Sequence, residues 1–186
     1  MAPDLLGRYI VRQFGGQRLI LRIVETEAYL GAQDRASHAW GGRRTKRSET
    51  LYSAPGVAYV YLIYGMYNCL NAVTGEAEVA DAVLIRAGEP VKGGAKMAGN
   101  RALARDPRSG DLAGGPGKLC MALSIDRSHN ARPLTSGSLR LTEGAPIAAA
   151  DVASGPRVGI DYAEEAVSWP LRFAVRGNPH VSRPFL

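Results

Sequence analysis

The sequence predicts an α+β fold built on a curved, mostly antiparallel β-sheet with flanking helices. Strand-like runs outnumber the helical runs, and glycine-containing turns separate them. The chain has 186 residues, of which 46% are hydrophobic, so it is long enough to bury one core without disulfide bonds or structural metal ions. We therefore expect residues 1–186 to form a single domain.

The first predicted turn is Gly15-Gly16, because glycine adopts positive φ at little cost. Residues 18–29 follow as a strand in which apolar residues occupy the odd positions as far as Ile23. Strict alternation would place the later odd positions, Glu25, Glu27 and Tyr29, on the same face as those apolar residues.

A dense tyrosine region, residues 57–73, predicts two strands joined by a turn at Tyr64-Gly65. This turn would place Tyr64 at or near the tip of a β-hairpin. A second turn is predicted at residues 74–78, followed by a short strand at residues 83–86.

The second half of the chain contains fewer clear elements. Short helices are predicted at residues 95–104 and 118–125, and strands at residues 138–142 and 171–175. Residues 90–117 are rich in glycine, lysine and arginine. We do not expect them to be a linker between domains, because neither flank is large enough to fold well alone.

Composition limits the class of protein. No apolar run approaches 18 residues, and the N-terminus has neither a signal nor a transit pattern, so we expect no membrane span and a cytoplasmic protein. The two cysteines and three histidines lack metal-ligand spacing, so we expect neither a metal nor another cofactor.

The net charge of +6 indicates a polyanionic partner. Four cations, Arg43, Arg44, Lys46 and Arg47, lie within five residues. Charge alone leaves two readings open: a contact surface for nucleic acid, or a solvated basic loop.

Two glutamates stand out on the predicted strand at residues 18–29. Glu25 and Glu27 would lie on one face, about 7 Å apart along the chain. Carboxylates on an inward face cost free energy unless they are solvated or paired. From the residues alone, the two glutamates are either a catalytic pair or part of a strand end that leaves the core and is exposed to solvent.

The tyrosine hairpin and its return strand also allow two readings. Tyrosine rings stack on bases, and a hairpin tip can wedge into a base stack, but tyrosine also simply favours strands. Asn71 lies among apolar strand residues and needs a hydrogen-bond partner, which a neighbouring backbone group could supply.

The order and the amino-acid sequences of these segments resemble those of the alkyladenine (3-methyladenine, methylpurine) DNA glycosylase family. The matching blocks are RIVETEAYLG at 22–31, Asp34 with ASH at 36–38, PG at 55–56, YVYLIYGMY at 59–67, LIRA at 84–87, EP at 89–90, GPGKLC at 115–120 and RFAVRG at 172–177. They span nearly the whole chain in the family order, with looser similarity at residues 92–113 and 145–167.

The resemblance assigns roles to single residues. Glu27 would be the general base, Glu25 a supporting residue, and Arg86 with the backbone carbonyl of Val175 would help to hold the catalytic water. The remaining assignments concern the base and the DNA: Tyr29, His38 and Tyr61 would sandwich a flipped base, Asn71 would disfavour the 2-amino group of guanine, and Tyr64 would fill the gap left in the duplex.

These roles imply a monomeric, monofunctional glycosylase that flips alkylated or deaminated purines from double-stranded DNA and hydrolyses their N-glycosidic bond. The expected substrates are of the 3-methyladenine, 7-methylguanine, hypoxanthine and ethenoadenine class, and the product would be an abasic site for base excision repair. Such a protein would act in the bacterial nucleoid, or in the nucleus of a eukaryote.

Two other functions are compatible with parts of the pattern. An inverting carbohydrate glycosidase could use Glu25 and Glu27 at this spacing, but neutral sugars explain neither the basic charge nor the tyrosine at the hairpin tip. A non-catalytic lesion-binding module would need no water-holding pair such as Glu27 and Arg86.

Overall fold

The computed structural model describes residues 1–103 and 108–184. Its strands form one curled eight-stranded sheet in which β3-β4-β5-β2-β1-β6 are consecutive neighbours, while β8 pairs with both β2 and β7. Every strand pair in the described residues is antiparallel. The strands are β1 (Tyr9–Phe14), β2 (Gln17–Leu30), β3 (Ala58–Ile63), β4 (Tyr67–Val73), β5 (Asp81–Lys92), β6 (Leu139–Thr142), β7 (Val152–Gly155) and β8 (Arg172–Val175).

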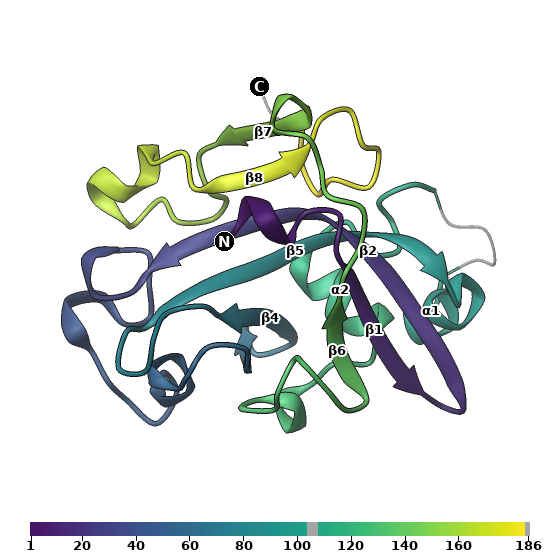
Figure 1. Ribbon diagram of the computed structural model, residues 1–186, viewed down its shortest axis with the longest axis horizontal. Coiled ribbons are helices and arrows are strands. Elements are labelled where there is room, and N and C mark those ends of the chain that lie inside the picture. The colour runs from purple at the N-terminus through teal and green to yellow at the C-terminus, as the bar shows by residue number, and fades with distance from the viewer. Residues whose placement is uncertain (104–107, 185–186) are drawn as a thin grey trace.

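The long strands β2 and β5 cross the whole molecule, with β7 and β8 along one side and β4 on the other (Figure 1). The first half of β2 pairs with β1, whereas Glu25–Glu27 pair with β8. Because β5 pairs with β2 on its other edge, the middle of β2 has a partner strand on both sides. This position explains how acidic residues of β2 come to be buried.

Two short helices, α1 (Gly94–Asn100) and α2 (Pro116–Ala122), pack on each other, and α2 also packs on β4 and β5. The main hydrophobic core includes buried residues of both helices, such as Met97 and Leu119, together with Leu21, Ile23 and Ile85 of the sheet. Seven short 3₁₀ helices complete the described structure: Pro3–Leu5, Gly31–Gln33, Trp40–Gly42, Glu49–Tyr52, Arg127–His129, Ala149–Asp151 and Glu164–Ser168.

The predicted elements are largely present, with changed bounds. The turn at Gly15-Gly16 and the hairpin at Tyr64-Gly65 are both observed. The predicted strand at residues 83–86 is only the middle of β5, which continues because it pairs along most of β2. β1 and β7 were not predicted.

The helix bounds also differ from the prediction. α1 ends at Asn100 rather than at residue 104, which lies outside the described residues. α2 begins two residues earlier than predicted, because Pro116 is favourable in the first turn of a helix, where its missing N–H is not needed. In the described part of the chain, no helix is long and apolar enough to cross a membrane.

Candidate active site

A β-bulge in β2 changes which residues face the core. The pairing of β2 with β5 shifts register between Ile23 and Glu25 and again between Glu25 and Thr26. Before the bulge, odd-numbered Ile23 packs in the main core; after it, even-numbered Ala28 packs against that core. The expectation of one continuous odd-numbered face was therefore wrong, because this irregularity inverts the alternation. Glu27 and Tyr29 lie on the face opposite to the core-facing part of the strand.

Glu27 is fully buried, accepts two hydrogen bonds and forms one ion pair. Its Oε1 accepts the backbone N–H of Val158 at 2.7 Å, and its Oε2 accepts the hydroxyl of Tyr29 at 3.0 Å. Nη1 of Arg86 lies 3.3 Å from the same Oε2. Since a carboxylate offers about four lone-pair sites, the two hydrogen bonds leave acceptor capacity for a further donor, such as a water molecule.

Arg86 joins Glu27 to Glu25. Its Nε donates to Oε1 of Glu25 at 2.9 Å, and Arg172 Nε donates to the same oxygen at 2.7 Å. The C-terminal segment adds two more donors, because Ser182 donates its backbone N–H at 2.6 Å and its hydroxyl at 2.9 Å to Glu25. Glu25 is thus saturated with donors, unlike Glu27, and its role in this geometry is to fix Arg86.

The charges in this cluster are balanced, with two carboxylates against two guanidinium groups. Burial alone would lower the pKa of Arg86, but the charges of Glu27 and Glu25 outweigh it, so the net effect is a raised pKa. Arg86 therefore stays cationic. Burial, followed by the charge of Glu27, raises the pKa of Tyr29 well above its usual value, so the Tyr29 hydroxyl remains a donor to the carboxylate.

A cavity of about 120 Å³ lies next to the residues that contact Glu27, although the fully buried Glu27 does not itself line it. Tyr29, Arg86 and Val158, the three contacts of Glu27, all line this cavity. Its aromatic and polar walls come from β2, β3, β4, β5 and two loops, and the predicted binding residues Tyr29, His38, Tyr61 and Asn71 all belong to them. The structure therefore brings these four residues and Arg86 together around one space.

The aromatic walls have a fixed geometry. The rings of His38 and Tyr61 are 4.6 Å apart with an interplanar angle of 77°, and His38 Nδ1 lies 2.8 Å from the Tyr59 hydroxyl. Burial, assisted by the charge of Arg47, lowers the pKa of His38 to about 4. His38 is therefore a neutral wall at physiological pH, and it adds no positive charge to the cavity.

Asn71 both makes a hydrogen bond to neighbouring backbone and lines the cavity. Its Nδ2 donates to the backbone carbonyl of Tyr59 at 3.1 Å, which is the neighbouring-backbone partner expected for a buried amide. The same bond fixes the amide at the cavity wall. A base that entered the cavity would meet an amide that is already ordered.

Val175, like Glu27 and Tyr64, is a predicted site residue that does not line the cavity. In the antiparallel pairing of β8 with β2, Glu27 lies opposite Arg172, three residues earlier in the chain. Val175 pairs with Val152 instead, and its carbonyl accepts the N–H of Asn178 at 3.3 Å. The backbone position that reaches Glu27 belongs to Val158, which precedes β8 in the chain.

The loop that carries Val158 was not predicted to belong to the site. Val158, Gly159, Ile160 and Tyr162 all line the cavity, although this segment contains no acid or base with an evident catalytic role. Its neighbour Arg157 forms a fully buried, two-pronged ion pair with Asp34. Asp34 stood in one of the matched blocks, but nothing in the sequence paired it with Arg157.

Tyr64 occupies the turn between β3 and β4. Its backbone and that of Gly65 both have positive φ, at 53° and 71°, and Met66 N–H closes the turn on the Ile63 carbonyl. The Tyr64 side chain is 77% exposed. A large aromatic side chain without covering neighbours at a hairpin turn is available for contact with another molecule.

The predicted basic cluster divides into two parts. Arg44 forms ion pairs with Glu49 and Glu78, so its charge is largely compensated. Arg43 and Arg47, by contrast, line a second cavity of about 360 Å³, which shares His38 with the first. Cationic side chains therefore lie beside the entrance to the aromatic cavity.

Among the described residues, no three His, Cys, Asp or Glu side chains lie close enough together to hold a metal ion. Cys69 and Cys120 are both free and buried.

Comparisons with known proteins agree with this architecture. The family model described as "Methylpurine-DNA glycosylase (MPG)" matches residues 1–179. A protein from Methanocella arvoryzae is 48% identical over 184 residues, which cover 98% of this chain and 90% of that protein. Relatives from Desulfitobacterium hafniense and Clostridium perfringens are 45% and 44% identical over 98% of this chain and over 92% and 93% of their own lengths. All three relatives bear the name "Putative 3-methyladenine DNA glycosylase". The chain therefore belongs to the methylpurine-DNA glycosylase family.

Proposed function

We propose that this protein is a DNA glycosylase that hydrolyses the N-glycosidic bond of a damaged purine flipped out of double-stranded DNA. The observation that carries the proposal is the state of Glu27. It is a fully buried carboxylate with two hydrogen-bond donors and an ion pair to Arg86, and the three residues that contact it line an aromatic cavity. The names and family of the relatives support the same reaction.

The reaction follows from these groups. A purine enters between the aromatic walls, which places its sugar near Glu27. The free acceptor site of Glu27 binds a water molecule and takes its proton as the water attacks the sugar carbon. As the bond to the base breaks, the sugar develops oxocarbenium-like positive charge, which the adjacent carboxylate stabilises. The water becomes the new hydroxyl of an abasic sugar, and Glu27 holds its second proton. A cationic N-methylpurine leaves as the neutral base, whereas a neutral purine such as hypoxanthine takes up a proton from solvent as it leaves.

The substrate class follows from the walls of the cavity. Stacking on tyrosine rings contributes roughly 1–3 kcal/mol per base and favours electron-poor purines. Damaged purines also unpair at lower cost than normal ones, which adds selectivity before chemistry. The proposed substrates are alkylated or deaminated purines of the 3-methyladenine, 7-methylguanine, hypoxanthine and ethenoadenine class, with the fixed amide of Asn71 disfavouring guanine.

Two further parts of the proposal concern DNA. The exposed Tyr64 ring would enter the base stack from a protruding β3-β4 hairpin and fill the gap left by the flipped nucleotide. Arg43 and Arg47 would contact backbone phosphates beside the cavity. The residues that line the cavity in the described part of the chain include no lysine, which supports hydrolysis without a Schiff-base lyase step.

The test is single-turnover release of 7-methylguanine from a duplex that contains it at one position. Glu27→Gln should abolish release while leaving binding to an abasic-site duplex unchanged. Glu76→Gln, which removes an exposed carboxylate outside the cavity, is the matched control and should behave like the wild-type protein. Undiminished release by Glu27→Gln would exclude Glu27 as the base, and wild-type binding without release would indicate a lesion-binding module instead.

A further inference from the structure

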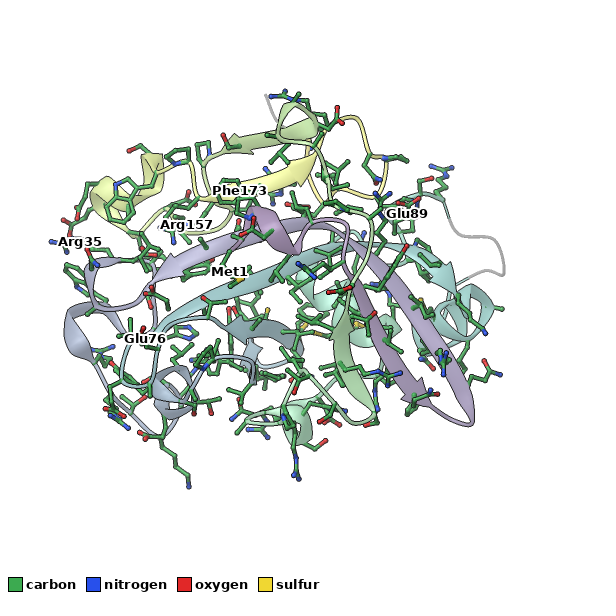
Figure 2. The ribbon with its side chains drawn as sticks, in the orientation of Figure 1. Met1, Arg35, Glu76, Glu89, Arg157 and Phe173 are labelled. Carbon is green, nitrogen blue, oxygen red and sulfur yellow. The ribbon has the colours of Figure 1, made fainter. Side chains whose placement is uncertain are left out.

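Arg157 is a buried cation next to the active site that the proposed mechanism does not use. Its side chain and that of Asp34 are both fully buried, and its two Nη groups donate to the two carboxylate oxygens of Asp34. Nη1 also donates to the backbone carbonyl of Ala28 in β2 at 2.9 Å. Figure 2 shows Arg157 between β2 and the yellow C-terminal part of the chain.

The guanidinium of Arg157 stacks on Tyr29, with its Cζ 4.7 Å from the centre of the ring. Tyr29 lines the cavity, whereas Arg157 does not. We take the base to stack on the face of the ring that Arg157 leaves free. A base stacked there would have the guanidinium directly behind the Tyr29 ring.

This arrangement affects bases according to their charge. A tyrosine ring attracts a cation through the negative potential of its face. A guanidinium held on one face makes the potential on the opposite face less negative, and it also repels a second cation across the ring. Asp34 compensates the charge of Arg157 through both Nη groups, but the guanidinium carbon itself lies over the Tyr29 ring.

We propose that Arg157 determines the base selectivity of the cavity by weakening its preference for cationic purines, so that neutral damaged purines are accepted on nearly equal terms. This inference rests on the proposed glycosylase function and adds to it the charge class of the substrate. A neutral purine such as hypoxanthine keeps its stacking and apolar contacts with Tyr29, whereas a cationic N-methylpurine loses much of its cation–π advantage. Arg157 acts through Tyr29 and does not touch the base.

The test compares two duplexes that differ only in the charge of the base. One contains 7-methylguanine, a cation, and the other contains its neutral isostere 7-methyl-7-deazaguanine. A 2′-fluorine on both sugars slows cleavage, because it disfavours an oxocarbenium-like transition state. The measured quantity is the ratio of the two dissociation constants, in which the costs of flipping and of DNA contacts largely cancel.

The variant that removes the buried charge is Asp34→Asn combined with Arg157→Gln, which neutralises both partners and avoids an unpaired buried ion. We expect its preference for the cationic duplex to exceed that of the wild-type protein by about tenfold, within the range of a partly desolvated cation–π contact. Arg35→Gln is the matched control, because Arg35 stacks on Trp40 at the same 4.7 Å but outside the aromatic cavity. It should leave the ratio unchanged.

A second measurement needs no variant, so misfolding of the double variant would not remove the test. The wild-type protein should bind the two duplexes within about threefold of each other, because Arg157 offsets most of the attraction between Tyr29 and a cation. A wild-type preference for the cation above tenfold would overturn the inference. An unchanged ratio in a folded double variant would do so too, since a purely structural role of Arg157 would weaken both duplexes equally. Absence of base release by the wild-type protein would instead overturn the proposed function.

Discussion

Glu25→Gln removes one negative charge from a buried group of two carboxylates and two arginines. Glu25 is fully buried and accepts hydrogen bonds from Arg86, Arg172 and Ser182. After the substitution one guanidinium charge is left without a counterion. A glutamine oxygen can still accept from some of these donors, but its amide group would face others.

The cost follows from the burial of the group. Breaking a buried ion pair by removal of one partner costs roughly 3–5 kcal/mol. The remaining amide oxygen places Glu25→Gln near the lower end, so we expect a loss of about 3 kcal/mol in the free energy of unfolding. For a chain of this size, that corresponds to a fall of roughly 6–12 °C in Tm.

Thermal unfolding followed by circular dichroism measures this effect, with Glu27→Gln as the comparison. Glu27 has one arginine partner rather than two, so its substitution should lower Tm by less. Well below the midpoint, folded Glu25→Gln should retain base release that Glu27→Gln lacks. The reasoning would be refuted if Glu25→Gln melted within about 2 °C of the wild-type protein.

Two other predictions concern His38 and Tyr64. The folded-state pKa of His38 is about 4, below its unfolded value near 6.5, so the unfolded state binds the proton more tightly and stability falls as pH drops through this window. Between pH 7 and pH 5, the free energy of unfolding measured in urea should fall by about 2 kcal/mol more for the wild-type protein than for His38→Gln. Equal falls for the two proteins would contradict this prediction. Tyr64→Asn, which tolerates the positive φ of the turn, should weaken binding to a paired lesion more than it slows release from an unpaired one, and equal losses would remove the wedge role.

Local signals predicted the elements whose ends are set by local chemistry. The Gly15-Gly16 and Tyr64-Gly65 turns need positive φ, and the sequence offers glycine at all of these positions except Tyr64. Strand bounds were less predictable, because β5 continues to Lys92 only where β2 supplies a partner. β7 is similar: it is a short strand without strong alternation, and its pairing with β8 defines it.

The candidate site was predictable where the relevant signal lay in a single side chain. Tyr29, His38, Tyr61, Asn71 and Arg86 could be proposed from their types and their places in the matched blocks, and they line one cavity in the structure. A backbone contact carries no such signal. Val175 and Val158 are both valines in short apolar contexts, and only the antiparallel register of β8, which places Arg172 opposite Glu27, separates them.

The bulge in β2 explains why the acids of this strand can be both buried and functional. Without it, Glu27 would share the face of Leu21 and Ile23 and would enter the main hydrophobic core, where no donors compensate it. The register shift places Glu27 on the opposite face, where Arg86 and the loop at Val158 supply a cation and an N–H. This irregularity leaves one residue of each strand, Val24 in β2 and Arg86 in β5, without a partner in the pairing of the two strands. It converts an unfavourable pattern of apolar and acidic side chains into a core on one face and a site on the other. Deleting Val24 would restore the strict alternation and should therefore abolish both folding and base release, whereas local variants of the cavity should spare the fold.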